Sequence, residues 1–186
     1  IVSGWFQAYR GQWFNRLVRI NPDGTADNTF NPFFGDRTAI YCTAPVAGGK
    51  MIATGHSLNE EGLFRREMAR LNPNGTIAES FVGFTNEKTE SVVVQPDGKV
   101  IVGGNFTTVN NVQMRRLARF HPDATLDQSF SATVDNFIWS CALQPDGKLL
   151  IAGGFYTVDG VSRVGVARLE TGTASGPQDV APALSV

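Results

Sequence analysis

The chain lacks an excess of charge of either sign: 16 basic residues nearly balance 17 acidic ones, and only two histidines and two cysteines are present. A balance this close to neutral argues against electrostatic binding to nucleic acid or to a membrane surface. Long apolar runs are also missing, so no segment reaches the length of about 20 residues that spans a bilayer. Helical periodicity is absent throughout. The sequence therefore predicts a β-rich chain with no nucleic-acid partner and no membrane insertion.

What the sequence has in abundance is repetition, with a period of 49 residues. A Pro-Asp-Gly-Lys turn followed by apolar residues and glycine begins at Pro96 and again at Pro145. The recurring positions are Lys50, Lys99 and Lys148; Arg19, Arg70, Arg119 and Arg168; and Phe30, Phe81 and Phe130. A period of this length is typical of propellers and solenoids.

The third copy displays the parts of one repeat. We expect strands at 91–95, 100–102 and 117–120, a turn at 96–99, a polar loop at 105–115 and a connector at 125–130. The first of these strands is rich in β-branched residues, and the turn has the glycine that a tight hairpin requires. Gly103–Gly104 ends the second strand, where backbones converge. The connector carries Phe130 as an anchor and predicts a weak fourth strand.

Three to four short antiparallel strands per repeat, without a helix, fit one blade of a β-propeller. The first two strands are apolar on both faces, which suits sheets packed between neighbouring blades. A parallel β-helix is the alternative, but its coils are usually shorter. We predict an all-β fold that is a β-propeller, or part of one, built from blades of about 49 residues. The predicted units are residues 1–35 (a partial blade), 36–84, 85–133 and 134–170, followed by a Gly/Ser/Pro-rich linker or tail at 171–186.

The ring is not expected to close within the 186 residues. Residues 1–4 align with the interior of a repeat, so the first copy begins at its second strand. About three and a half blades are fewer than the four to eight of a usual ring. We therefore expect further repeats upstream, and we expect the linker to lead into a tail or another domain.

The copies differ in two turns. Copy two has a hairpin turn two residues longer, at 45–50, which accounts for an offset of 51 rather than 49 residues and suits a solvent-exposed tip. In the turn after the third strand, Ala124 stands where Gly24 and Gly75 stand in other copies. We expect the geometry of that turn to differ.

The two cysteines are not expected to form a disulfide. Cys42 lies three residues before Pro45 and Cys141 four residues before Pro145, so they occupy adjacent positions of equivalent strands, two repeats apart. They should point to opposite faces, whereas a disulfide requires Cα atoms within about 7 Å. We expect two buried free thiols that pack as small hydrophobic side chains.

The combined motif resembles the bacterial delta-60 repeat, a predicted β-propeller repeat of large secreted or cell-surface proteins. The first half of the pattern is best matched by Gln95 to Phe106 and Gln144 to Phe155, and the second half by the segments from Arg19 to Phe30 and from Arg119 to Phe130. The resemblance covers roughly residues 1–170. Copy two departs from it, with Ser57 in place of phenylalanine and Ala78 in place of aspartate. The resemblance implies an extracellular or cell-surface location and a bacterial source, and it supplies no catalytic residues.

Residues with the spacing of a metal site are lacking. His56 and His121 occupy different repeat positions, and neither has the nearby cysteine or second histidine that zinc requires. The aspartate pairs Asp23/Asp27 and Asp123/Asp127 offer too few oxygen ligands for calcium, and we expect them to cap turns. We expect no metal and no cofactor.

Catalytic constellations are missing as well. Glu60–Glu61 and the pair Glu87 and Glu90 are expected to be solvated, and no Ser/His/Asp set has a suggestive spacing. Gly103–Gly104 and Gly153–Gly154 precede loops rather than helices, unlike a phosphate-binding loop. We expect no enzymatic activity. A polysaccharide-active site assembled from several blades, as in propeller glycosidases, is the alternative.

The recurrent arginines are expected to be structural. Each lies in a small-Arg-apolar triplet, and its rigid fork of donors suits a bond between strand and turn. The expected partners are turn aspartates such as Asp97 or Asp146. An anion-binding role for Arg19, Arg70, Arg119 and Arg168 is the alternative.

Ligand-binding residues are expected where the copies disagree. Trp5, His56, Asn105 and Gly154 are equivalent positions just after a common glycine, yet they are chemically unrelated, and the loops that follow differ as well. A fixed core with variable loops concentrates recognition in the loops. The candidate ligand-binding residues are Trp5, Tyr9, Trp13, His56, Asn105, Trp139 and Tyr156. The alternative is that the aromatic side chains among them pack over neighbouring blades.

The sequence thus predicts a non-catalytic extracellular recognition or adhesion module of a larger bacterial surface or secreted protein. Its expected partners are a protein or glycan ligand and further repeats or domains of the same chain. The first alternative is a structural element of a surface filament, whose exposed blade edges pair with other copies. The second is a propeller enzyme that acts on polysaccharide.

Overall fold

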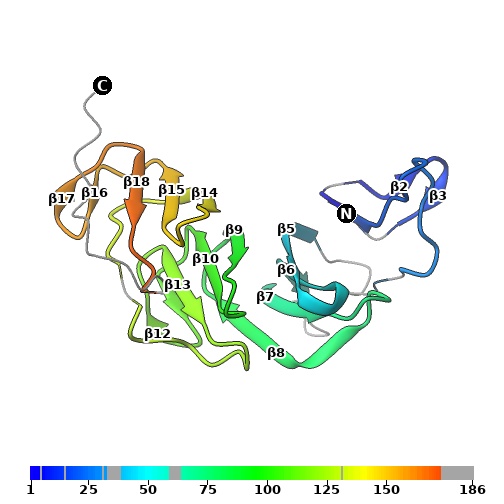
Figure 1. The fold of residues 1–186 in the computed structure, drawn as a ribbon, viewed down its shortest axis with the longest axis horizontal. Coiled ribbons are helices and arrows are strands. Elements are labelled where there is room, and N and C mark those ends of the chain that lie inside the picture. Colours follow the sequence, from blue (N-terminus) through cyan, green and yellow to red (C-terminus); the bar gives the residue numbers. More distant parts are fainter. Residues whose placement is uncertain are drawn as a thin grey trace.

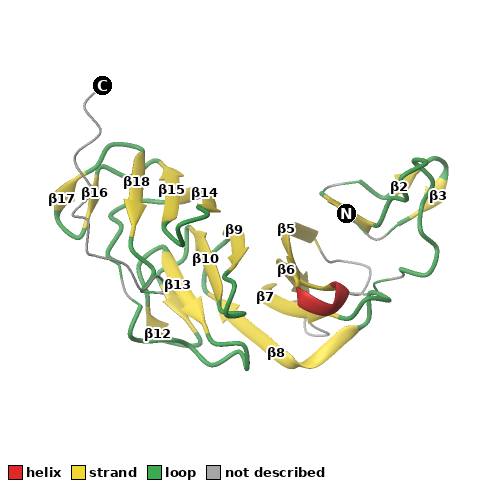
Figure 2. Ribbon diagram, in the orientation of Figure 1, coloured by secondary structure: helices red, strands yellow, loops and turns green. Residues whose placement is uncertain are grey.

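The computed structural model describes residues 1–4, 6–14, 16–30, 32, 39–58, 64–130 and 132–172, with the main chain alone at 56–58, 64–67 and 79–82. These residues form four β units that follow one another along an open arc (Figure 1). We call the units blade 1 (residues 1–30), blade 2 (39–85), blade 3 (86–130) and blade 4 (132–172). Apart from one short 3-10 turn, the regular structure is strand (Figure 2), which confirms the all-β prediction. In these described ranges there is no helix with the length and apolarity needed to cross a membrane.

The blades share one topology, in which the first, second and third strands pair antiparallel in chain order with the second strand at the centre. In blade 3 these strands are β9 (Thr89–Val94), β10 (Val100–Gly104) and β13 (Leu117–Phe120); in blade 4 they are β14 (Ile138–Leu143), β15 (Leu149–Gly153) and β18 (Val166–Leu169). In blade 2 they are β5 (Ala39–Val46), β6 (Lys50–Leu58) and β7 (Phe64–Leu71), followed by a fourth strand, β8 (Ile77–Thr85). Blade 1 has the second and third strands, β1 (Val2–Ser3) and β4 (Leu17–Val18).

The first strands form the inner side of the arc. Strand β9 lies between β5 and β14 and packs against both, and the three strands stand together on the concave side (Figure 1). The third strands lie farther out. The residues that border the axis of the arc therefore come from the first strand of each blade.

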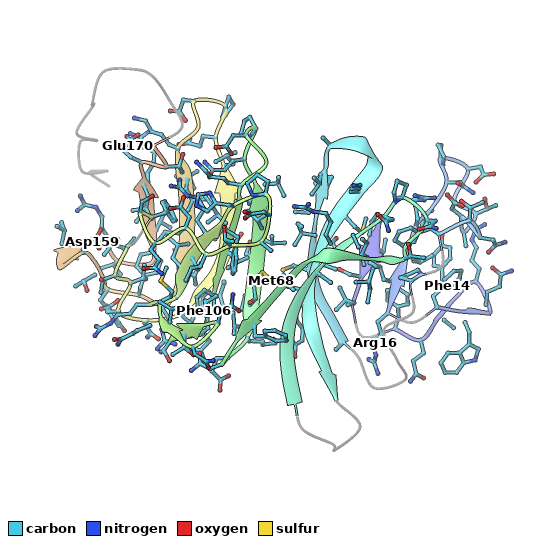
Figure 3. All side chains as sticks on the ribbon, turned by 90° about the horizontal axis from the view of Figure 1, so that it is seen from below. Phe14, Arg16, Met68, Phe106, Asp159 and Glu170 are labelled. Carbon is cyan, nitrogen blue, oxygen red and sulfur yellow. The ribbon has the colours of Figure 1, made fainter. Side chains whose placement is uncertain are left out.

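The core lies between the blades rather than inside any one of them. Three apolar clusters fill the junctions between successive blades. Strand β10 contributes to two of them: Val100 and Val102 pack toward blade 2, and Ile101 packs toward blade 4. Figure 3 shows Met68 and Phe106, from blades 2 and 3, near the junction that they share. The first two strands were predicted to be apolar and covered on both faces, and this holds for the second strand β10, whereas the first strands β9 and β14 include polar or exposed residues.

A recurrent glycine lets the second strand of each blade pass close to the first. A β-carbon at Gly104 would stand 2.1 Å from the carbonyl oxygen of Lys88, and one at Gly153 would stand 2.1 Å from that of Phe137. In blade 2 a β-carbon at Gly55 would stand 2.0 Å from the Ala39 carbonyl oxygen. No side chain larger than hydrogen fits at these positions. The close approach of the two backbones therefore explains why glycine recurs at this position of the repeat.

The predicted polar loops are short hairpins. They comprise β2 (Ala8–Tyr9) with β3 (Gln12–Trp13), β11 (Thr108–Val109) with β12 (Val112–Gln113), and β16 (Thr157–Val158) with β17 (Val161–Ser162). Both residues at each tip have positive φ, as in a type I′ turn, for example 47° at Asn110 and 64° at Asn111. The Oδ1 atom of Asn110 accepts a hydrogen bond from the amide of Phe84, and that of Asp159 accepts one from Thr133. These bonds fix the hairpins of blades 3 and 4 onto the segment that precedes the first strand of each blade.

Copy two differs because it lacks a turn-forming aspartate. Asp27 and Asp127 each accept a hydrogen bond from the amide two residues later, which starts a tight turn toward the buried Phe30 and Phe130. Ala78 cannot do this, and the chain continues there as the nine-residue strand β8. The predicted fourth strand is thus a full strand in blade 2, while the described connectors of blades 1 and 3 each make a single bridge.

The turn with Ala124 keeps the geometry of its glycine counterparts, so the prediction of a different geometry is wrong. Ala124 has a φ of 73°, against 80° at Gly24 and 90° at Gly75. The closing hydrogen bonds from His121 to Thr125 and from Asn21 to Thr25 are both 2.8 Å long. Alanine therefore occupies the left-handed region because the surrounding strands impose it.

We expect Ala124→Gly to stabilise the chain by about 1 kcal/mol, because the left-handed conformation carries no β-carbon penalty in glycine. The measurement is equilibrium urea unfolding, followed by far-ultraviolet circular dichroism. Gly24→Ala, in the equivalent turn of blade 1, should lower the stability by a similar amount. A loss of stability in Ala124→Gly would contradict this account.

Both cysteines are free, as predicted. Cys141 is buried between blades 3 and 4, whereas Cys42 is half-buried against the junction of blades 2 and 3. Burial raises the pKa of the Cys42 thiol to about 11 and that of Cys141 to about 12. Both side chains are therefore neutral thiols at physiological pH and poor nucleophiles.

The last blade extends beyond the predicted boundary at residue 170. Thr171 is buried, and its hydroxyl donates a 2.6 Å hydrogen bond to the carbonyl of Gly147 in the hairpin turn between β14 and β15. It occupies the position of Pro73 and Pro122 in the earlier copies. Residue 171 is thus part of the blade and not of a linker. The rest of the predicted linker, from 173 onward, lies outside the described residues.

Candidate functional site

The recurrent arginines tie each blade to the next. Each donates a hydrogen bond to a main-chain carbonyl of the following blade: Arg19 to Pro73 (2.6 Å), Arg70 to Pro122 (2.8 Å) and Arg119 to Thr171. The acceptors Pro73, Pro122 and Thr171 are 49 residues apart, and so are the donors Arg70 and Arg119. Every arginine with a described next blade therefore holds the turn after the third strand of that blade. The guanidinium groups act as connectors between sheets, which is a structural use of their donors.

The carboxylate partners of these arginines differ from the prediction. The Nε atom of Arg19 lies 2.7 Å from Asp27 Oδ2, and Nη2 of Arg119 lies 2.8 Å from Asp127 Oδ2. The connector folds back beside the third strand, since the Asp127 amide donates a hydrogen bond to the Arg119 carbonyl. This return of the chain, eight residues later, brings the two side chains together.

Asp97 and Asp146, the partners expected from the sequence, cap the hairpin turns instead. Each accepts a hydrogen bond of 3.1 Å from the amide two residues later, at Lys99 and Lys148. Asp97 also forms an ion pair with the Lys99 ammonium group. Burial works to raise the pKa of Asp97, but hydrogen bonds from Lys99 and the charges of Lys99 and Arg119 outweigh it, so Arg119 acts on Asp97 only through its charge while it bonds Asp127 directly.

Asp127 is the most enclosed of these carboxylates. Its burial works to raise its pKa, but hydrogen bonds from Ser129 and the charge of Arg119 outweigh that effect, so the pKa of Asp127 lies below its usual range. The Arg119 guanidinium also lies 4.4 Å from the centre of the Phe130 ring, and that of Arg19 lies 4.8 Å from the Phe30 ring. Arginine, aspartate and phenylalanine thus form one unit in blades 1 and 3.

The predicted ligand-binding aromatics do not converge on one loop surface. Trp13 is 75% exposed on β3 in blade 1, and Tyr156 is 64% exposed beside β16 in blade 4. These hairpins stand at opposite ends of the arc, as the labelled Phe14 and Asp159 show (Figure 3). A single small ligand does not reach both.

Two other candidates have structural contacts. The Tyr9 hydroxyl donates a 2.8 Å hydrogen bond to the Gly24 carbonyl, which braces the first hairpin. The Asn105 side chain is exposed and accepts a 2.9 Å hydrogen bond from Arg116. Trp5 lies outside the described residues, and at His56 the main chain alone is described, within β6.

Trp139 lies on the inner strand β14, at a β-bulge. The register with β15 shifts between Ile138 and Ser140, so Trp139 has no partner residue in the ladder. Ile138 and Cys141, on either side, both point into the core between blades 3 and 4. The bulge turns Trp139 away from that core and leaves it 62% exposed.

The same bulge recurs in each inner strand. In β5 the register with β6 shifts between Ile40 and Cys42, so Tyr41 is the bulge residue. In β9 the positions opposite Gly103 and Gly104 are Ser91 and Thr89, so Glu90 is the bulge residue. Tyr41, Glu90 and Trp139 are 49 residues apart. The bulge therefore presents one residue of each inner strand at the inner edge of its blade. This residue is aromatic in blade 2, acidic in blade 3 and aromatic in blade 4.

Neighbouring side chains extend these bulge residues into two groups, Tyr41 with Lys88 and Glu90, and Phe137 with Trp139, which together we call the inner rim. The Lys88 ammonium group lies 4.6 Å from the centre of the Tyr41 ring on the preceding blade and 3.1 Å from Glu90 Oε1. The Phe137 and Trp139 rings are 4.9 Å apart. An ion pair of blade 3 thus contacts an aromatic ring of blade 2, and blade 4 carries an aromatic pair at the equivalent positions.

The variable position after the common glycine adjoins the inner rim. The amide of Asn105 donates a hydrogen bond to the Lys88 carbonyl, and the amide of Gly154 donates one to the Phe137 carbonyl. The Phe137 ring lies over Gly154, where a β-carbon would stand 2.4 Å from the ring. The choice of glycine in this copy therefore makes room for the aromatic pair.

The inner rim offers aromatic ring faces and charged groups that can form hydrogen bonds, a combination suited to ligand recognition. Among the described residues there is no group of three or more His, Cys, Asp or Glu side chains that would hold a metal ion. Sequence reasoning identified Trp139 but missed Tyr41, Lys88 and Phe137. The signal was available, since positions 41, 90 and 139 disagree among copies as clearly as positions 56, 105 and 154 do.

Comparison with known protein families shows to which family the chain belongs. The family described as a domain of unknown function (DUF5122) β-propeller matches residues 1–30, 49–81, 95–130 and 144–172. The chain belongs to this β-propeller family. The four matches follow the four blades, and the predicted propeller fold is confirmed in the form of an arc whose sheets do not close into a ring. No curated protein and no solved structure shows significant similarity to the chain.

Proposed function

We propose that the chain is a non-catalytic recognition module of a larger extracellular or cell-surface bacterial protein, and that it binds a glycan or protein ligand through the inner rim. The observation that carries the proposal is the recurrent bulge, which presents Tyr41, Glu90 and Trp139 at one repeat position on three adjacent strands. Bulges often direct a side chain toward a functional site. The resemblance of the repeat to the delta-60 repeat of large surface proteins supports the proposed location.

The chemistry of the inner rim fits a ligand that lies across several blades. The exposed Trp139 ring and the half-buried Tyr41 ring provide rigid apolar faces at low entropic cost, on which a sugar ring or an apolar side chain can stack. Lys88 and Glu90 supply donors and acceptors between them. The fixed core and the bulge leave these side chains free to differ between copies, as they do here.

The test compares two exposed tryptophans on an array of purified polysaccharides and glycoproteins. Trp139→Ala is expected to weaken binding to the retained ligand about thirtyfold, the loss of about 2 kcal/mol that is usual for an aromatic anchor. Trp13→Ala, at the far hairpin, serves as the matched control and should bind as the parent does. Far-ultraviolet circular dichroism checks that both variants are folded.

Either of two results would contradict the proposal. Equal binding by Trp139→Ala and the parent would exclude the inner rim as the binding surface. A loss in Trp13→Ala of the same size would place recognition on the hairpins, as the loop-based interpretation of the sequence has it.

A further inference from the structure

The outer face of blade 4 repeats a surface that is covered in the other three blades. On the third strand, Leu17, Met68 and Leu117 are buried at 0%, 1% and 1% exposure by the blade that follows, whereas the equivalent Val166 is 52% exposed. On the second strand, Ile52 and Ile101 are fully buried and the equivalent Leu150 is half-exposed. In the described structure nothing packs on this face.

The polar groups of this face are also those of an interface. Arg168 is equivalent to Arg19, Arg70 and Arg119, each of which donates to a carbonyl of the next blade, yet its side chain is exposed. Ser140 is equivalent to Ser91, whose hydroxyl accepts a 2.9 Å hydrogen bond from the Cys141 amide across the junction of blades 3 and 4. Blade 4 thus carries both the apolar and the hydrogen-bonding parts of a blade-to-blade contact.

Blade 1 carries the complementary face. In blade 3 the residues that receive blade 2 are Val102, Phe106, Met114 and Phe120, all buried; the equivalent residues of blade 1 are Val2, Phe6, Phe14 and Ile20. Val2 is 45% exposed, and the other three are half-exposed. Pro22 stands where Pro73, Pro122 and Thr171 accept the arginine bonds.

We propose that the outer face of blade 4 binds blade 1 of a second copy of this chain, head to tail, with the Arg168 guanidinium donating to the Pro22 carbonyl. The argument is continuity: three successive junctions within one chain use the second and third strands of each blade and the same arginine bond, and the outer face of blade 4 and the open face of blade 1 supply these two strands and that bond for a fourth. Such a contact is heterologous, so repetition yields a closed ring or an open filament. This inference is independent of the ligand proposed for the inner rim.

The test uses two charge substitutions that disable opposite halves of the contact. The parent chain of 20.1 kDa is expected to form larger species as its concentration rises, measured by sedimentation velocity. Val166→Asp, on blade 4, and Val2→Asp, on blade 1, should each remain monomeric. Both sites are already exposed, so neither change disturbs the fold, which circular dichroism checks.

An equimolar mixture of the two variants discriminates between modes of association. Val2→Asp retains an intact blade 4 face and Val166→Asp retains an intact blade 1, so a head-to-tail contact predicts a one-to-one dimer in the mixture alone. A contact between two like faces predicts that the variant with that face intact still self-associates alone and that mixing adds no new complex, and that result would overturn the proposal.

A second pair of variants tests the arginine bond. Arg168→Ala is expected to raise the dissociation constant of the parent assembly about tenfold, whereas Arg163→Ala should leave it unchanged. Arg163 is the control because its Nη1 atom donates to the adjacent Ser162 carbonyl, away from the proposed contact. Equal effects of the two substitutions would overturn the assignment. A parent chain that remains monomeric up to about 1 mM would overturn it too, and would point to a further blade of a longer polypeptide as the occupant of the face.

Discussion

Gly104→Ala is expected to lower the free energy of unfolding by about 3 kcal/mol or more, the range of severe overpacking. The added β-carbon would stand 2.1 Å from the Lys88 carbonyl oxygen and 2.9 Å from the Thr89 Cα atom. Both are backbone atoms, so no side chain can move aside to relieve the contact. Relief requires β9 to separate from β10, which removes the bulge at Glu90 and loosens the apolar junctions on both sides. Equilibrium urea unfolding, followed by tryptophan fluorescence, measures the loss.

Gly160→Asn provides the matched control for this prediction. No atom lies within 4 Å of a β-carbon at Gly160, whose φ is +76°. The equivalent residue of blade 3 is Asn111, with a φ of 64°, so asparagine is already accepted at this position of the hairpin. We expect a change of a few tenths of a kcal/mol at most. If Gly104→Ala were as mild as Gly160→Asn, the close approach of the strands would not be the reason for the recurrent glycine.

Asp127→Ala is expected to cost about 3 kcal/mol, because it leaves the buried Arg119 guanidinium without its carboxylate. The Arg119 and Asp127 side chains are 7% and 4% exposed, and two nitrogens of the arginine lie within 2.9 Å of Asp127 Oδ2. The substitution also removes the hydrogen bonds that Asp127 accepts from Ser129, which shape the connector. Thermal and urea unfolding should both report the destabilisation.

Asp27→Ala separates the effect of burial from that of the turn. Arg19 and Asp27 make the same ion pair in blade 1, but their side chains are 30% and 20% exposed. Water can replace part of the lost contact, so the loss should be clearly smaller than in Asp127→Ala. Equal losses at the two sites would mean that the turn, and not the buried charge pair, accounts for the stability.

The sequence predicted the blades well because their cause is local and repeated. The uninterrupted apolar run of Val100, Ile101 and Val102 requires cover on both faces, and a repeat of 49 residues supplies it by placing a similar sheet on either side. The longer turn at 45–50 was correctly placed at a hairpin tip, where the 3-10 turn at Ala47–Gly49 joins β5 to β6. These features need no knowledge of distant contacts.

The candidate site was predicted less well because it depends on register and on partners far along the chain. A bulge shifts one residue out of the ladder, and nothing in the alternation of residues 138–143 marks Trp139 as that residue. The arginine partners were misassigned for a related reason. Asp97 lies in the turn between the first two strands of the same blade and Asp127 in the connector that follows Arg119, and only the return of the connector decides between them. Ala124 shows that tertiary context can impose a backbone conformation on a residue that disfavours it.

The arginine bond between blades has a consequence for how such chains change over time. Its acceptor is a main-chain carbonyl, at Pro73, Pro122 or Thr171, so the contact does not depend on the side chain of the receiving blade. Any copy that retains the arginine can therefore precede any other copy. Gene segments that encode single blades can be duplicated, deleted or exchanged without a compensating substitution for this bond, although the apolar side chains at the new junction must still fit one another. The inner-edge side chains travel with each segment, so recombination alone can produce new arrangements of binding groups on an unchanged framework.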